Sequence, residues 1–549
     1  SKSINKYSAG WNKYLLGSYE QNEDGSYSYT TNRVGNEVST DLNSTNETAG
    51  DRRIYLEAMV DYNRTFGRHD VNAMLLYNQD ELVNNVPGNN LINSLPKRKQ
   101  GLAGRLSYAY DGKYMAEVNM GYNGSENFAK GHRWGFFPSI ALGYNISEES
   151  FFEPLRKVIT SMKLRGSWGL VGNDQIGGER FIYMPTINLS GKGFTTGIDQ
   201  NYGLSGPVYT RYENNSITWE VGEKINLGID LQLLNSLNIV VDIFRETRRD
   251  IFQKKGTIPT YLGTGNTDVF GNLAEMKNQG LDLSIDYNKA FSKDFYMNFK
   301  GTFTYAHNEI TKYDEAPKYA FQSKVGQSAN VSQGYLSNGL FLDEAEIDRY
   351  NQQMGSTLGA GDIKYLNVSN MHGYGDDIVD VDDWTWIGNP TVPEIVYGFG
   401  PSFKYKNWDF SFFFQGVAKT SLFMSGFHPF GDNSLRNVLQ FVANDRWSPT
   451  NQNVDAKYPR LTRKTSLNNT NPGNSGRTSD YWMRDGSFLK LKNMELGYTF
   501  KRMRFYISGS NLLTFSKFDL WDPEQGGGSG LKYPTQRVFN VGFQMTFNN

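Results

Sequence analysis

The stretch from Arg537 to Phe547 constrains the fold of this chain more than any other segment. It reads R-V-F-N-V-G-F-Q-M-T-F, so apolar side chains alternate with small or mostly polar ones. The apolar series is Phe539, Val541, Phe543, Met545 and Phe547. A strict period of two indicates a β-strand with one apolar face. Such a strand, ending on an aromatic residue, is typical of the last strand of an outer-membrane β-barrel.

The same alternation recurs along the chain. Over residues 102–122 it runs on both sides of Asp111-Gly112, a pair that is typical of a tight hairpin turn. Further stretches of this kind lie at 224–233, 295–305 and 408–414. The stretch 489–500 changes phase after Leu491, and we expect a β-bulge there.

The connections between these stretches alternate in length. Short ones lie near 64–70, 111–113, 147–160, 234–236, 289–293, 406–407 and 500–502. We expect long external loops near 20–53, 172–215, 248–278, 307–392, 418–487 and 511–536. Short periplasmic turns and long external loops are typical of transmembrane barrels. The sequence therefore predicts an all-β transmembrane antiparallel barrel with about sixteen strands in this chain, including a weak one around residues 5–19.

Composition agrees with this fold. The mean hydropathy of −0.57 fits a barrel, because half of each strand faces a polar lumen. No apolar run reaches the roughly eighteen residues that a transmembrane helix needs. The 549 residues include no cysteine, which excludes a disulfide framework and a thiolate metal site. A net charge of −1 gives no sign of a nucleic-acid partner.

Aromatic residues gather near the ends of the predicted strands, among them Tyr122 and Trp408. We expect them to form belts at the two membrane–water interfaces rather than to pack in a soluble core. At the C-terminus, we expect Phe543, Met545 and Phe547 to face lipid. They would also form the signal that outer-membrane assembly machinery reads.

Several motifs lie in order over most of the chain. They are N-F-A-K-G-H-R-W-G-F-F-P-S-I-A-L-G-Y from Asn127, G-L-V-G-N-D from Gly169, K-G-T-I-P-T from Lys255, N-Q-G-L-D-L-S from Asn278, I-G-N-P-T-V-P-E-I-V-Y-G-F from Ile387, D-G-S-F-L-K-L-K-N-M-E-L-G-Y-T-F from Asp485, S-N-L-L-T-F from Ser510, D-P-E from Asp522 and Y-P-T-Q-R-V-F-N-V-G-F-Q-M-T-F from Tyr533. With these motifs the chain resembles the C-terminal half to two-thirds of SusC/RagA-type TonB-dependent transporters of Bacteroidetes outer membranes.

That family has a barrel of about twenty-two strands and an N-terminal plug. The resemblance implies that residues 1–549 are the C-terminal part of one barrel domain, without the plug. The chain opens at Ser1 with no secretion signal, so we expect its natural N-terminus to be missing. Open sheet edges have no partners in lipid. We therefore expect pairing with an N-terminal fragment that carries the plug and the remaining strands.

The resemblance implies TonB-dependent import of a large nutrient, foremost an oligosaccharide, across the outer membrane. A SusD-like surface lipoprotein would cap the loops, TonB would act through the missing part, and transporter–lipoprotein pairs would form dimers. The barrel would contact outer-membrane lipid and lipopolysaccharide. Within the same transporter class, the cargo could instead be an oligopeptide. The chain could also form a passive porin of about sixteen strands, in which residues 5–19 would pair with 537–547, or a non-transporting surface receptor.

The sequence indicates no enzyme. The five histidines are scattered without an H-E-x-x-H motif, and no G-x-S-x-G motif occurs. The loop 372–383 is acidic, and many members of the resembled family carry a calcium-type loop here. By that resemblance Asp376, Asp380 and Asp383 are candidate ligands for Ca²⁺ or Mg²⁺. We favour a solvated acidic loop, because such an ion needs about six oxygen ligands.

Aromatic residues in the long loops are candidates for ligand binding, since sugar rings stack on aromatic faces. The candidates are Trp384, Trp386, Phe427, Trp447, Tyr481 and Trp482. Each could instead pack within a loop, which is the interpretation we favour, because loops routinely bury an aromatic side chain.

Overall fold

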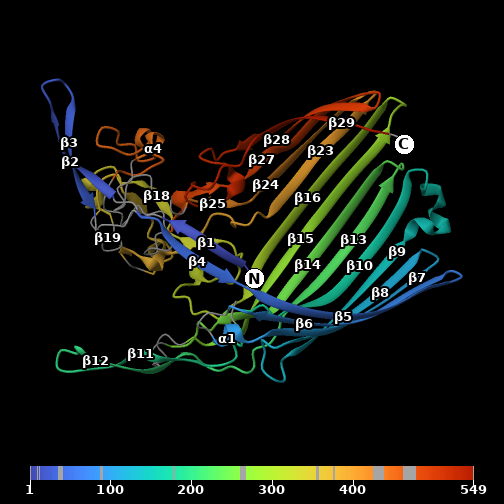
Figure 1. Cartoon of the computed structure of the whole chain (residues 1–549), viewed down its shortest axis with the longest axis horizontal. Helices are drawn as coiled ribbons and strands as arrows, with labels where there is room; N and C mark the ends of the chain where they lie inside the picture. The colour runs from blue at the N-terminus through green and yellow to red at the C-terminus, as the bar shows by residue number, and fades with distance from the viewer. Residues whose placement is uncertain are drawn as a thin grey trace.

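In the computed structural model, one antiparallel sheet of fifteen strands dominates the chain (Figure 1). The structure describes residues 2–8, 10, 13–34, 41–86, 91–176, 180–259, 268–350, 352–353, 358–374, 377–424, 438–461 and 478–547. The sheet strands are β5 (Asp51–Phe66), β6 (His69–Asn84), β7 (Lys97–Tyr110), β8 (Tyr114–Ser125), β9 (Trp134–Asn145), β10 (Ile159–Asn173), β13 (Glu220–Leu233), β14 (Leu237–Lys254), β15 (Phe270–Ala290), β16 (Phe295–Lys312), β23 (Ile395–Tyr405), β24 (Trp408–Ala418), β27 (Phe488–Phe500), β28 (Met503–Ser516) and β29 (Val538–Met545). Each pairs with the next sheet strand along the chain, so the wall is a simple meander.

The two ends of this curved wall differ. At one end the connections are short turns, at 67–68, 111–113, 234–236, 291–294, 406–407 and 501–502, together with one longer connection at 146–158. At the other end lie the long connections 85–96, 126–133, 174–219, 255–269, 313–394, 419–487 and 517–537. We call these the turn end and the loop end. Asp111 and Gly112 have φ of 54° and 66°, which is the geometry that their sequence predicts for a tight hairpin turn.

Small elements fill the connections, most of them at the loop end (Figure 1). The short strands are β11 (Thr186–Thr196), β12 (Tyr202–Arg211), β17 (Ser332–Gly334), β18 (Ser337–Leu340), β19 (Gln352–Gln353), β20 (Ile363–Tyr365), β21 (Ile378–Val379), β22 (Thr385–Ile387), β25 (Ser421–Phe423) and β26 (Met483–Asp485). The helical turns are α1 (Leu91–Ser94), α2 (Glu344–Ile347), α3 (Val368–Met371), α4 (Gln440–Asn444), η1 (Ile146–Glu148), η2 (Ser150–Leu155), η4 (Ala320–Gln322), η5 (Val381–Asp383), η6 (Asp480–Trp482) and η7 (Pro523–Gln525). In the described part of the chain, no helix has the length and apolar character needed to cross a bilayer.

The N-terminal segment differs from the sequence prediction. β1 (Lys2–Ser8) pairs with β4 (Asn43–Ala49), and β2 (Lys13–Gln21) pairs with β3 (Tyr27–Val34). The weak strand expected around residues 5–19 is thus divided between two small sheets, and neither is part of the large one. The large sheet holds fifteen strands, one fewer than predicted, because a period of two does not say which partner a strand takes.

Strand register sorts the side chains of the sheet onto two faces. One face, which we call the apolar face, carries exposed aliphatic residues at mid-strand, such as Leu227 and Ile243, which are 63% and 59% exposed. The polar face carries ion pairs, for example Arg165 with Asp230 at 2.9 Å and with Asp242 at 2.7 Å. An apolar face of this extent that none of the described residues covers is what a lipid-facing barrel wall requires.

The predicted bulge is present in β27. Its register shifts between Leu491 and Asn493 against β28, and at the same place against β24. Lys492 is the extra residue opposite β24. The phase change that the sequence shows after Leu491 therefore has a physical cause in strand pairing.

Candidate functional site

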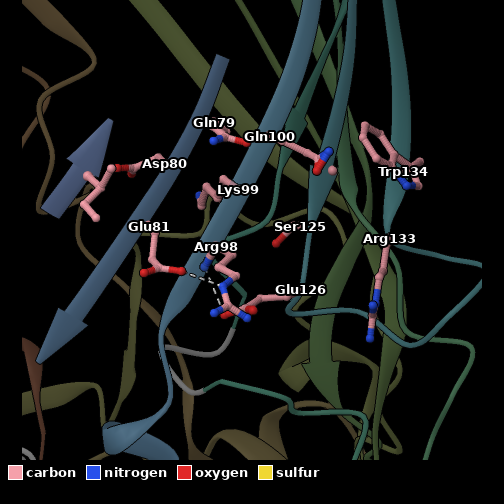
Figure 2. A pocket seen from close by; sticks show the side chains of 12 residues that line it. Gln79, Asp80, Glu81, Arg98, Lys99, Gln100, Ser125, Glu126, Arg133 and Trp134 are labelled. Carbon is pink, nitrogen blue, oxygen red and sulfur yellow. Dashed lines mark hydrogen bonds and ion pairs between the residues drawn. The ribbon is translucent and has the colours of Figure 1, made fainter. Parts of the chain in front are cut away.

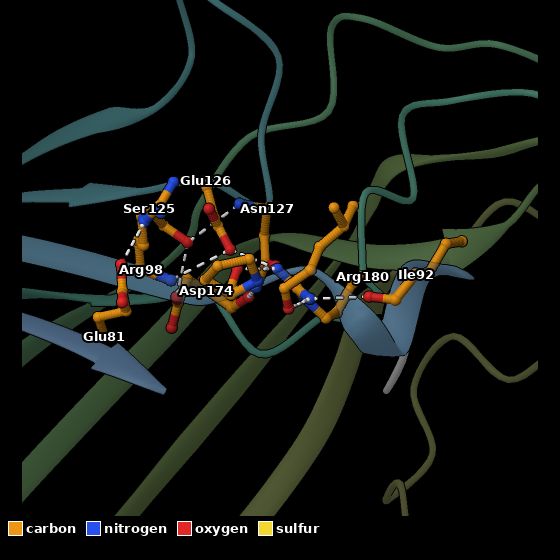
Figure 3. A network of polar contacts seen from close by, with 10 residues as sticks. Glu81, Ile92, Arg98, Ser125, Glu126, Asn127, Asp174 and Arg180 are labelled. Carbon is orange, nitrogen blue, oxygen red and sulfur yellow. Dashed lines mark hydrogen bonds and ion pairs between the residues drawn. The ribbon is translucent and has the colours of Figure 1, made fainter. Parts of the chain in front are cut away.

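A polar network at the loop end joins two of the sequence motifs (Figure 3). Asp174, which ends the motif G-L-V-G-N-D, accepts hydrogen bonds from Lys99 Nζ at 2.7 Å and from Ser125 Oγ at 2.8 Å. Its main-chain carbonyl accepts one from Asn127 Nδ2 at 3.1 Å. Asn127 begins the preceding motif, so residues far apart in the sequence meet where β7, β8 and β10 enter the loops.

Arg180 ties the β6–β7 connection to this network (Figure 3). Its guanidinium donates to the carbonyls of Ile92, Leu95 and Pro96 at 3.0, 2.8 and 2.7 Å, and it also pairs with the carboxylate of Glu126. The planar guanidinium has several N–H donors in fixed directions and can therefore bind three carbonyls and a carboxylate at once, whereas a lysine would supply a single point charge. Arg180 therefore orders residues 91–96 from a loop that is distant in sequence.

Arg180→Ala should loosen residues 91–96 without unfolding the wall. Hydrogen bonds to a charged group contribute roughly 1.5–3 kcal/mol, so amide exchange over this turn should quicken by about tenfold or more. Hydrogen–deuterium exchange of the intact receptor measures it. Arg156→Ala is the control, because Arg156 lies 3.8 Å from Glu148 at the turn end and should leave this turn unchanged. Unchanged exchange in Arg180→Ala would contradict the role.

A second network joins the motifs K-L-K and D-P-E. Lys490 is 0% exposed, and its Nζ donates to Asp522 Oδ2 at 2.5 Å and to Glu524 Oε2 at 2.8 Å. Lys492 contacts both oxygens of Glu524, at 2.7 and 2.9 Å. These ion pairs fasten the 517–537 connection to β27.

Burial and hydrogen bonding act in opposite directions on the pKa values of the two carboxylates of this network. Burial works to raise the pKa of Asp522, but hydrogen bonds from Lys490 and from the Glu524 amide hold that pKa below its usual value. The pKa of Glu524 is likewise lowered, since hydrogen bonds from Lys490 and Lys492 outweigh burial. A carboxylate with a lowered folded-state pKa stabilises the fold above its unfolded-state pKa. That contribution disappears as the pH falls through the lowered value.

The packing of 517–537 against β27 should therefore be insensitive to pH between about pH 5 and 8 and should weaken below about pH 4. Limited proteolysis of this connection across the pH range measures the effect. The same series on a variant that carries Asp522→Asn and Glu524→Gln should lose this pH dependence. A wild-type profile that weakens towards high pH would contradict the assignment.

The long loops share a buried apolar cluster, which we call the loop core. It consists of Tyr335, Leu340, Ile363, Tyr365, Val379, Leu422, Met424, Val442, Trp447, Ala456, Tyr458, Trp482 and Phe518. These residues come from three connections, at 313–394, 419–487 and 517–537. The loop end is therefore a packed body and not a set of separate loops.

The aromatic ligand candidates lie in or against the loop core. Trp482 is 0% exposed and Trp447 is nearly so, while Trp384 and Tyr481 pack against the cluster from outside. Trp386 is half-buried and donates from Nε1 to the Ser323 carbonyl at 2.9 Å. Phe427 lies outside the described residues. A ligand-binding role stays a prediction for this set, and in this conformation the ring of Trp482 is closed off from solvent.

The described metal-ligand candidates accept hydrogen bonds from main-chain amides of their own turn and of α3. Asp380 accepts from the Asp382 amide at 2.8 Å, and Asp383 accepts from the amides of Ser369 and Asp380 at 2.9 and 2.8 Å. Asp376 lies outside the described residues. Among the residues that are described, no group of three or more His, Cys, Asp or Glu side chains is placed to hold a metal. Ion binding by this loop stays a prediction.

The C-terminal signal residues lie on the apolar face of β29 or just beyond it. Phe543, Met545 and Phe547 are all exposed, and the ring of Phe543 lies tilted against that of Phe505 of β28, with 5.1 Å between ring centroids. Their orientation fits a lipid-facing edge. Recognition by assembly machinery stays a prediction.

A hollow in the wall is a feature that the sequence did not reveal (Figure 2). It encloses about 560 Å³ at the loop end of β5–β9. Its lining includes Gln79, Arg98, Gln100, Arg133 and Trp134. Gln79, Arg98, Gln100 and Trp134 come from β6, β7 and β9, and Arg133 comes from the connection before β9, so strand register brings them together. Arg133 and Trp134 belong to the motif that starts at Asn127, whereas the other three residues lie in none of the motifs.

Comparison with known proteins agrees with this architecture. The family described as TonB dependent receptor-like, beta-barrel, matches residues 2–512. TonB-dependent receptor P3 of Formosa agariphila is 25% identical over 94% of this chain and 54% of its own length. TonB-dependent receptor SusC of Bacteroides thetaiotaomicron is 28% identical over 81% of this chain and 43% of its own length.

Among solved structures, the RagAB peptide transporter superposes with a TM-score of 0.67 at 20% identity, over 90% of this chain and 56% of that one. This chain thus spans about half the length of the curated relatives it matches. The lipid-facing wall, the ordered motifs and these matches agree. The chain belongs to the TonB-dependent receptor β-barrel family of the outer membrane, and it is similar to SusC in sequence and to the RagAB transporter in fold.

Proposed function

We propose that the protein to which this chain belongs imports a large polar nutrient across the outer membrane, driven by TonB. The observation that carries the proposal is the fifteen-stranded wall with an apolar outer face and a polar inner face, in a chain of this family. A barrel built on such a wall surrounds a wide polar lumen. Its relatives are receptors and transporters, and the sequence offers no catalytic motif.

The polar face favours an uncharged cargo. Several of its arginines are paired with neighbouring carboxylates, as in Arg165 with Asp230 and Asp242, and Arg504 with Glu495 at 2.5 Å. Thr304 Oγ1 bonds to Asp282 at 2.6 Å, and Asn298 Nδ2 bonds to Asn288 at 2.6 Å. Paired charges, hydroxyls and amides suit an oligosaccharide, which is our leading substrate class. An oligopeptide is the second candidate, as the RagAB structure is that of a peptide transporter.

The proposed assembly has further parts. A SusD-like lipoprotein would dock on the packed loop end. The fold match to a chain of the RagAB transporter supports the role of this chain as the barrel of such a pair. The remaining strands and a plug would come from the rest of the protein, and TonB would act on the plug. Pairs of transporter and lipoprotein would form dimers. A Ca²⁺ or Mg²⁺ ion in the 372–383 loop would add rigidity to this surface.

Uptake in the native host tests the proposal. Cells that lack the gene should lose uptake of one labelled oligosaccharide from a panel of glycans and peptides, and the gene restored on a plasmid should recover it. Uptake should also fail when TonB is deleted. Binding to intact cells that never leads to TonB-dependent uptake would instead indicate a non-transporting receptor. Uptake that survives without TonB would indicate a passive porin.

Membrane orientation gives a more direct check. The chain has no cysteine, so single cysteines report on chosen positions once any others in the whole protein are replaced. On intact cells, a membrane-impermeant maleimide should label Asn453→Cys at the loop end and should not label Lys406→Cys at the turn end. Opening the outer membrane should make Lys406→Cys reactive. The reverse pattern would show that the barrel is inserted the other way.

A further inference from the structure

The hollow at the loop end of β5–β9 opens on the lipid-facing side of the wall. Gln79 lies directly opposite Gln100, and both share their face with Tyr77 and Leu102, which belong to the exposed apolar face. Trp134 lies opposite Gly124 on that same face. Gln79, Gln100 and Trp134 therefore place the hollow at the loop-end edge of the apolar face, on the outside of the wall. Asp80 and Lys99 also line it, but by register their side chains point to the polar face.

Trp134 forms a flat platform in this hollow. Its ring stacks on Tyr122 with 4.8 Å between centroids and 16° between planes, yet it is 45% exposed. Gly124 lies beneath the ring, and a Cβ atom there would come within 3.1 Å of it. One face of the indole is thus held against the strands while the other stays open, which is the arrangement that stacks on a sugar ring.

The remaining walls are polar without a strong net charge. Arg98 Nε donates to Glu81 at 2.8 Å on this face, whereas the ion pair of Lys99 with Asp174 lies on the polar face behind it. Exposed amides at Gln79 and Gln100 lie beside the platform. Arg133 adds one exposed cation, whose Nε donates to the Phe128 carbonyl at 3.1 Å. Amides and paired charges around an aromatic face match sugar hydroxyls, and the single cation suits a phosphate substituent.

We propose that this hollow binds the saccharide head of a glycolipid of the outer leaflet. Because the hollow adjoins the apolar face, it favours a saccharide that is attached to a membrane lipid over a soluble saccharide. The head would lie on Trp134 while its acyl chains cover the adjoining apolar residues such as Leu102 and Phe136, which are otherwise exposed. A soluble saccharide would gain nothing from that apolar surface. The inference rests on the orientation in the proposed function, with the loop end outside.

Retention of glycolipid by the intact receptor tests the inference. The receptor is purified, stripped of lipid, incubated with lipopolysaccharide from its own host and moved into fresh detergent. The amount of bound glycolipid per barrel is then quantified from its hydroxylated fatty acids. Wild type should retain about one molecule per barrel, and Trp134→Ala or Gln100→Ala should weaken retention about tenfold. Trp134→Phe, which keeps an aromatic face, should lose less. Heat-modifiable migration on gels confirms that each variant is folded.

Trp408→Ala is the matched control. Trp408 also lies on the apolar face, half exposed and tilted against the ring of Tyr498 with 4.7 Å between centroids, but at the turn end. It should retain the glycolipid as wild type does. Equal retention in Trp134→Ala and wild type would overturn the inference. So would lipid-free oligosaccharide, released from the same lipopolysaccharide, that binds as tightly as the intact glycolipid. Loss in Trp408→Ala alone would overturn both the inference and the proposed orientation, whereas failed uptake with normal retention would overturn only the transport function.

Discussion

The double variant Asp522→Asn, Glu524→Gln should be destabilised by about 3–5 kcal/mol, because it leaves the fully buried ammonium of Lys490 without a charged partner. Burying an unpaired charge costs far more than the original ion pair contributes. The loss should appear first in the 517–537 connection, which these two carboxylates fasten to β27. Proteolysis of that connection and urea titration of the receptor in lipid vesicles measure it.

A triple variant that adds Lys490→Met provides the control. It removes the buried charge together with its partners, and a Met side chain fills a similar volume. Replacing a whole buried ion pair by apolar residues is often close to neutral, so most of the lost stability should return. If the triple variant were as unstable as the double one, the loss of stability would come from the substitutions at 522 and 524 themselves and not from the unpaired charge of Lys490.

Leu227→Arg should impair insertion of the barrel. Leu227 lies at mid-strand on the apolar face and is 63% exposed, and an arginine at the centre of the bilayer costs about 2–4 kcal/mol. The amount of folded receptor in the outer membrane should fall, and its unfolding free energy in vesicles should drop by a similar amount.

Asn226→Arg is the matched control on the next residue of the same strand. Its side chain points to the polar face, where a cation meets water and neighbouring carboxylates. It should insert and unfold as wild type does. Equal damage from both substitutions would contradict the assignment of Leu227 to lipid, since the cost of an arginine would then not depend on which face of β13 carries it.

Much of the wall could be predicted from residue spacing, because each strand carries its own period of two. The Asp111-Gly112 turn and the phase change after Leu491 also have local causes, and both are present in the structure. The segment 5–19 shows the limit of this reasoning. Its alternation is real, but pairing with 43–49 and 27–34 is a choice between partners that spacing alone does not encode.

The candidate site was harder to predict, since burial and proximity depend on how distant segments meet. Trp482 looks like any loop aromatic in the sequence, and it is buried only because three connections converge on it. The ion pair of Lys490 with Asp522 likewise joins two motifs. Each motif can be recognised in the sequence, but the sequence does not show that they are in contact. The hollow at Trp134 could not be predicted without knowing how the neighbouring strands are aligned. Its strand residues nevertheless follow the same alternation as the apolar face.

The bulge in β27 has a consequence for the side chains beyond it. Between Phe500 and Met494 the even-numbered residues face lipid, and an unbroken strand would continue that series through Lys492 and Lys490. The inserted residue rotates the rest of the strand by half a turn. Leu491 and Leu489 thereby take the lipid side, and Lys490 turns inward to its carboxylates. One extra residue thus lets a single strand serve both as membrane wall and as anchor for the 517–537 connection.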